Sequence, residues 1–128
     1  MSQAKRKAVE IVIQRAYEDP TPADGYRVLV DRFWPRGRSK EALKLDDWAK
    51  EIAPSAELIK WFGHAPERWE EFQNRYGEEL GRPEQTEKLL EMLAAAGANR
   101  ITLVYGAHNE EANQAIVIRD FIHGLKAT

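Results

Sequence analysis

The sequence predicts a small three-layer α/β domain in which a short, mainly parallel sheet of three or four strands is flanked by helices. Three observations lead to this fold class. Short apolar runs typical of strands cover residues 9–14, 27–31 and 101–105. Apolar residues three and four positions apart indicate several helices between the second run and the third. A long helical connection of this kind makes the two strands that it joins parallel.

The length and composition are those of one domain that covers residues 1–128. The net charge of −2 argues against a protein that coats nucleic acid, because such proteins are strongly basic. The chain has no cysteine, which excludes a disulfide framework, a thiolate metal site and a cysteine nucleophile. No signal-peptide core follows the basic N-terminus, and no apolar run approaches the roughly 20 residues of a membrane span. We therefore expect a cytoplasmic protein without a membrane partner.

The first half of the chain contains two strands and a helical segment. The strand over residues 9–14 is followed by a loop with two prolines, residues 17–26, and then by the strand over residues 27–31. Ser39 is expected to cap a short helix. The apolar residues after it have helical spacing, and we predict that this segment stays helical up to Pro54: Leu45, Trp48, Ala49 and Ile52.

Three further helices are predicted before the last strand. Ser55 is a natural N-cap for the first of them, and Gly63 ends it. The second begins near Pro66, and the third covers residues 84–96. The second helix has an apolar stripe that we expect to face the core: Trp69, Phe72, Tyr76 and Leu80.

Several segments of the chain resemble the YeaO-like bacterial proteins. These segments are residues 17–26, 30–37, 48–55 and 61–64, together with Arg75-Tyr76, residues 103–109 and Asn113. The resemblance covers nearly the whole chain, and it implies a compact α/β fold with no assigned substrate. Related sequences tend to carry cysteines near the turn after the last strand. This chain has none, so the resemblance does not extend to a thiol-based mechanism.

The loop that follows the second strand is the first candidate site. Ligands of open α/β sheets bind beyond the carboxyl ends of the strands, and this loop is basic and aromatic over residues 32–40. Guanidinium groups fit phosphate and carboxylate, so we predict that Arg32, Trp34 and Arg36 bind a ligand. Asp31 ends the strand; we expect it to be buried, to pair with Arg32 or Arg36, and to be a candidate catalytic residue. Alternatively, Asp31 and Arg32 form a structural ion pair and the other cations are solvated.

The turn after the third strand is the second candidate site. A glycine turn between a strand and a helix directs backbone amides toward an anion, and we predict that the last helix starts near Glu110. His108 is a candidate catalytic acid or base, because histidine titrates near neutral pH. The predicted ligand-binding residues of this segment are Tyr105, Gly106, Asn109 and Asn113. Alternatively, Asn109 is an ordinary N-cap and His108 an exposed turn residue.

A third group consists of aromatic residues around Gly63. Trp61, Phe62, His64 and Trp69 either form the walls of a pocket or pack into the core, and their helical spacing favours the core. His64 and His108 have no third ligand at a zinc-like spacing. We therefore expect no metal and no cofactor.

The predicted function follows from the two loops. If the second and third strands are neighbours, the loops after them converge at one edge of the sheet, and we expect a small ligand with a phosphate or carboxylate group to bind there. Enzymatic activity stays open, because no nucleophile with its base can be read from the chain. One alternative is a nucleic-acid-binding accessory or regulatory protein that uses loop 32–40. Another is a non-catalytic interaction module.

Overall fold

The computed structural model describes residues 10–97 and 100–127, and in these ranges the predicted α/β fold is confirmed. The sheet has four parallel strands: β1 (Ile11–Arg15), β2 (Tyr26–Leu29), β3 (Asp47–Trp48) and β4 (Ile101–Tyr105). Their order in the sheet is β1-β4-β2-β3. The expectation that the strands before and after the long helical connection are parallel neighbours is also confirmed, because β2 pairs directly with β4.

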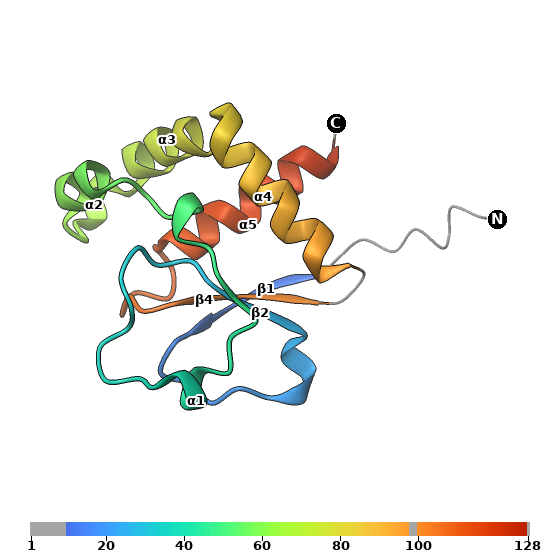
Figure 1. The fold of residues 1–128 in the computed structure, drawn as a ribbon. Helices are drawn as coiled ribbons and strands as arrows, with labels where there is room; N and C mark the ends of the chain where they lie inside the picture. The colour runs from blue at the N-terminus through green and yellow to red at the C-terminus, as the bar shows by residue number, and fades with distance from the viewer. Residues whose placement is uncertain (1–9, 98–99, 128) are drawn as a thin grey trace.

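The helices are distributed unequally over the two faces of the sheet (Figure 1). Four helices lie over one face: α2 (Ala56–Phe62), α3 (Trp69–Leu80), α4 (Pro83–Ala96) and α5 (Gln114–Ala127). The short helix α1 (Lys40–Leu43) lies over the opposite face. Within the described residues, no helix combines the length and the apolar character that crossing a bilayer requires.

Each face of the sheet has its own apolar core. The larger core lies under the four helices and includes Phe72, Tyr76 and Leu80 from α3, all at most 2% exposed. Trp69, which was expected to be buried with them, is only partly buried and packs against the edge of this core. The smaller core lies on the side of α1 and contains Ala16, Leu29, Leu43 and Val104, with Trp34, Leu45 and Trp48 packed against it.

The predicted helix caps around the site are confirmed. The Ser39 side chain accepts a hydrogen bond from the N–H of Ala42 at the start of α1. The Ser55 side chain does the same for the N–H of Leu58 at the start of α2, and Gly63 ends that helix with a φ of 52°. Glycine is favoured at this left-handed position, because it has no Cβ that would clash with the preceding turn.

The segment between α1 and Pro54 differs from the prediction. Helical spacing predicted a helix there, but the chain forms the edge strand β3 and then a short 3₁₀ helix, Lys50–Ile52. The reason is pairing with β2: the N–H of Asp46 donates to the carbonyl of Arg27 at 2.8 Å, and that of Ala49 to the carbonyl of Leu29 at 2.9 Å. Hydrogen bonds to an open sheet edge therefore outweigh the helical pattern of this short stretch.

Candidate functional site

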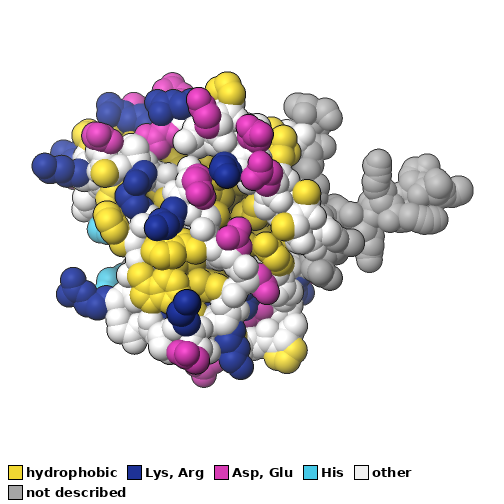
Figure 2. Space-filling view, viewed as in Figure 1, with side chains coloured by type: hydrophobic (Ala, Val, Ile, Leu, Met, Phe, Trp, Pro, Cys, Tyr) yellow, Lys and Arg dark blue, Asp and Glu magenta, His cyan; other side chains and the backbone are white. Residues whose placement is uncertain are grey.

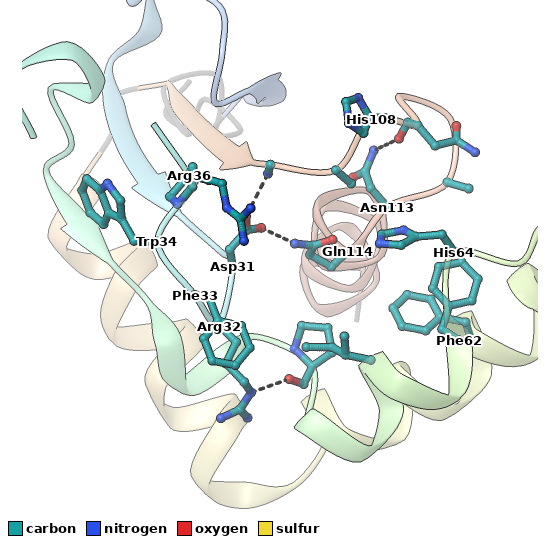
Figure 3. A pocket seen from close by; sticks show the side chains of 18 of the residues that line it. Asp31, Arg32, Phe33, Trp34, Arg36, Phe62, His64, His108, Asn113 and Gln114 are labelled. Carbon is teal, nitrogen blue, oxygen red and sulfur yellow. Dashed lines mark hydrogen bonds between the residues drawn. The ribbon is translucent and has the colours of Figure 1, made fainter. Parts of the chain in front are cut away.

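A cavity of about 590 Å³ opens at the carboxyl ends of β2 and β4. This volume lies in the range of roughly 300–1,000 Å³ that is usual for small-molecule sites. Three segments line the cavity: the loop after β2, the end of α2 with His64, and the turn after β4 with the start of α5 (Figure 3). The convergence of the loops after β2 and β4 follows from the parallel pairing of these two strands.

Most of the residues that the sequence singled out meet at this cavity. The predicted site residues that line it are Asp31, Arg32, Trp34, Arg36, Gly106, His108, Asn109 and Asn113. Tyr105 is not among the lining residues, because its side chain is only 2% exposed and belongs to the larger core. The roles of these residues in catalysis or in ligand binding stay predictions.

Asp31 lies at the inner end of the cavity and is held by uncharged donors (Figure 3). Its Oδ2 accepts a hydrogen bond from the N–H of Gly106 at 2.9 Å, and its Oδ1 accepts one from the side-chain amide of Gln114. The indole N–H of Trp48 donates to the Asp31 carbonyl at 2.7 Å. These three contacts fix both the backbone and the carboxyl group of Asp31.

The expected ion pair between Asp31 and an arginine is wrong. Within residues 10–97 and 100–127, Asp31 takes part in no ion pair. The Nε–H of Arg32 instead donates to the carbonyl of Pro54 at 3.0 Å, and Arg36 is exposed. Asp31 is nevertheless mostly removed from solvent, although a part of it remains exposed.

The surroundings of Asp31 change its acidity. Burial raises the pKa of its carboxyl group to about 6, while the hydrogen bonds from Gly106 and Gln114 act in the opposite direction. Burial has this effect because a low-dielectric site disfavours the charged form. The group is therefore mostly a carboxylate at neutral pH and gains a proton under mildly acidic conditions.

Gly106 lies very close to the carboxyl group of Asp31. A Cβ atom at this position would lie 2.8 Å from Oδ2 of Asp31, which is too close for two unbonded atoms. The N–H of Gly106 is also occupied, because it donates to the same carboxylate. The predicted binding of an anion by the backbone amides of this turn stays a prediction, and the N–H of Gly106 itself donates to Asp31.

The last helix begins later than predicted. It starts at Gln114 rather than near Glu110, and Asn113 caps it by accepting a hydrogen bond from the N–H of Ile116 at 3.2 Å. Asn109, considered above as the alternative N-cap, instead accepts from the N–H of Glu111 in the preceding turn. The physical reason is that residues 110–113 form turns and bends, which place the cap at the second asparagine.

Exposed histidine and arginine side chains lie at the rim of the cavity. His64 and His108 both line it and both are exposed, and Figure 2 shows histidine side chains on either side of an indentation at the left edge of the molecule. His64 has a φ of 58°, an uncommon value for a residue other than glycine. The guanidinium group of Arg36 is exposed, and within the part of the chain that the structure describes it has no hydrogen-bond or ion-pair partner.

The walls of the cavity are largely aromatic and aliphatic. Phe62 and His64 line it, whereas Trp61 and Trp69 do not. Phe62 belongs to the wall and to the core at once, because its ring stacks on Phe72 at 4.3 Å between centroids. The prediction that the aromatic residues around Gly63 pack into the core therefore holds only in part, because Phe62 and His64 also face the cavity.

Comparisons with known proteins agree with the resemblance noted in the sequence. The family model described as the inactive DUF488-N3 subclade matches residues 10–127. The chain belongs to this family. It is 41% identical to the uncharacterized protein YeaO of Escherichia coli over 117 residues, which cover 91% of this chain and 100% of that protein. It is 37% identical to an uncharacterized protein of Mycobacterium tuberculosis over 118 residues, which cover 92% of this chain and 98% of that protein. No solved structure matches the chain significantly.

Two residues that hold Asp31 in this DUF488-N3 chain were not predicted as site residues: Gln114 and Trp48. Gln114 was not among the candidates, although its amide donates to Oδ1 of Asp31. The sequence does contain a clue to Gln114, because an asparagine at position 113 is a common N-cap and makes Gln114 the first residue of α5. From this position the side chain of Gln114 reaches Asp31 at the end of β2. In the described part of the chain, no group of three or more histidine, aspartate or glutamate side chains is placed to hold a metal ion.

Proposed function

We propose that the cavity binds a small organic molecule that carries a phosphate or carboxylate group, with this anionic group at the rim beside Arg36. One observation carries the proposal: an exposed guanidinium group, for which the described residues provide no partner, lies at the mouth of a cavity with mostly apolar walls. Guanidinium groups form paired, charge-assisted hydrogen bonds with phosphate and carboxylate. The apolar walls supply contact area for the rest of the molecule.

The charge distribution supports an anion at the rim rather than at the inner end. Asp31 is mostly ionised at neutral pH, and a second anion next to its carboxylate would be repelled. The amide of Gly106 is already occupied by that carboxylate. Arg36, His64 and His108 are exposed residues of the cavity lining, whereas Asp31 is mostly covered. A ligand with an apolar body and one anionic end fits this division.

We propose binding without turnover. The chain contains no cysteine, and the matching family model is described as an inactive subclade. In a binding role His108 is a contact at the rim and Asp31 a polar contact at the inner end. Neither residue then needs to transfer a proton.

A nucleic-acid interface over residues 32–40 is less well supported. The Nε–H of Arg38 donates to the carbonyl of Ala16 at 2.8 Å, and Arg32 is held by Pro54. The Trp34 ring is half-buried and packs against Trp48 at 5.3 Å between centroids, which leaves Phe33 as the exposed aromatic ring of this loop. We therefore make no second proposal of function.

The experiment is an amide NMR titration with phenyl phosphate, in parallel with inorganic phosphate. We expect shifts that cluster at residues 31–36 and 106–114, and tighter binding of phenyl phosphate because its ring occupies the apolar part of the cavity. Arg36→Ala should weaken binding of both probes by about tenfold or more, the loss expected when a charged hydrogen bond is removed.

The matched control is Arg82→Ala. Arg82 is also an exposed arginine, lies at the start of α4, and its side chain makes no capping hydrogen bond. This variant should titrate like the parent protein. Shifts that spread over the surface, or equal affinities in the two variants, would show that the anion does not bind at this rim.

A further inference from the structure

We propose that Asp31 selects the ligand by accepting two N–H hydrogen bonds from the edge of a planar nitrogen heterocycle. The ligand of the cavity is then a nitrogen heterocycle that also carries an anionic group. This inference rests on the proposed function, because it assigns the inner end of the same cavity whose rim binds the anion. The guanine ring of a mononucleotide has the required chemistry, with two adjacent N–H donor groups on one edge.

The carboxylate of Asp31 has unused hydrogen-bond acceptor positions. An ionised carboxylate has about four lone-pair positions, two on each oxygen. Gly106 donates to one oxygen and Gln114 to the other, and no other residue in the described ranges donates to the carboxyl group. Each oxygen therefore keeps one acceptor position. Two adjacent N–H groups match two carboxylate oxygens as a pair, in the way that an arginine fork does.

The Asp31 carboxylate is also held in one orientation. Oδ2 is fixed by a backbone amide, and the backbone of Asp31 is fixed by the indole of Trp48. A Cβ at position 106 would displace the carboxylate, so the neighbouring backbone is adapted to its presence. A polar group held in one orientation discriminates between ligands, because a ligand without matching donors leaves it unpaired.

Aromatic rings form two walls of the cavity. Phe33 and Phe62 lie on opposite sides of it and come from different segments (Figure 3). Phe33 is 70% exposed, so a large apolar ring remains uncovered at the mouth. Aromatic side chains gain contact energy against planar rings. A flat heterocycle between these walls points its edge toward Asp31 and its substituent toward Arg36.

The acidity of Asp31 is consistent with this assignment. Burial raises its pKa to about 6, which means that the two existing hydrogen bonds do not offset the loss of water around the carboxylate. Two N–H donors from a ligand would stabilise the ionised form. A ligand that presents only acceptors would instead face the carboxylate with like partial charges.

The test is calorimetric titration of the wild-type chain at pH 7 with three mononucleotides and phenyl phosphate. Guanosine 5′-monophosphate presents two adjacent N–H donor groups, inosine 5′-monophosphate one, and adenosine 5′-monophosphate a donor next to an acceptor. We expect affinity to fall in this order, with about tenfold or more between the first and the last. This order depends on the ligands alone and needs no variant.

Asp31→Asn supplies the complementary test. It keeps the shape of the side chain but replaces one acceptor by a donor, so guanosine monophosphate should bind about tenfold more weakly. Phenyl phosphate should bind more tightly, because a negative charge has been removed from the cavity. Asp19→Asn is the matched control, since Asp19 is an exposed carboxylate outside the cavity.

The outcomes separate the two proposals. If phenyl phosphate does not bind the wild-type protein at the rim, the proposed function itself is wrong. If it binds there but the three nucleotides bind equally well, the anion site stands and the selection by Asp31 is wrong. A guanosine monophosphate affinity that is the same in Asp31→Asn and in the wild type also overturns the inference.

Discussion

The replacement Asp31→Asn tests the electrostatics of the cavity through stability. Burial raises the pKa of Asp31 from 3.8 to about 6 in the folded protein. The folded protein thus binds this proton more tightly than the unfolded chain does. Its free energy of unfolding therefore decreases as pH rises from about 4 through 6. With about 1.4 kcal/mol per pKa unit, the decrease attributable to this group is about 3 kcal/mol.

The Asp31→Asn variant has no carboxyl group at this position, so it does not lose stability through ionisation of a buried acid. Its Oδ1 can accept from Gly106, and its amide can donate to Gln114 once the Gln114 amide is flipped. The free energy of unfolding of the variant should therefore rise relative to that of the wild type as pH increases. Between pH 4 and pH 7 this relative gain should reach up to about 3 kcal/mol. Urea unfolding followed by tryptophan fluorescence at pH 4, 5, 6 and 7 measures this difference.

Asp19→Asn provides the control for the removal of an exposed carboxylate, and its curve corrects for the change in net charge. Wild-type and Asp31→Asn stabilities that run parallel over the whole pH range would refute the reasoning. So would a variant that becomes relatively less stable as pH rises, since the carboxylate would then be a net stabilising acceptor.

Three further substitutions test the packing around the cavity, each by urea unfolding. Gly106→Ala should cost about 1–3 kcal/mol, because its Cβ displaces the Asp31 carboxylate; an unchanged midpoint would mean that the carboxylate moves away freely. Tyr76→Phe should also cost about 1–3 kcal/mol, because the buried Tyr76 hydroxyl donates to the carbonyl of Ile52, which would lose its partner. Phe72→Ala should cost about 3–5 kcal/mol, since the ring is 2% exposed and stacks between aromatic neighbours; a loss below about 1 kcal/mol would contradict its place in the core.

The position of the cavity could be predicted from the sequence for a simple reason. Two apolar strand runs, separated by a long helical stretch, must pair in parallel if they are neighbours, and their following loops then leave the sheet at one edge. Arg36 and His108 are far apart in the chain, and the parallel pairing of the two strands predicts that they lie at the same edge of the sheet. The helix caps at Ser39 and Ser55 were equally accessible, because each depends on a few consecutive residues.

Other features depend on contacts that a sequence pattern does not contain. The two-residue strand β3 exists because the edge of β2 offers hydrogen bonds, while the side chains of this segment fit a helix equally well. The partners of Asp31 are a backbone amide and Gln114 rather than an arginine. Charge complementarity in sequence suggested an arginine, but side-chain direction at the strand end decides which donors reach the carboxylate.

The position of β4 in the sheet has a consequence for how the protein folds. β1 and β2 follow each other in the chain but do not pair; β4 lies between them. Neither early strand can therefore form its main hydrogen bonds until residues 101–105 have been synthesised. Closing these distant pairings costs chain entropy and slows folding. Before β4 is available, β2 can pair only with the two-residue strand β3, so most of the apolar strand edges stay open to aggregation until β4 inserts between β1 and β2.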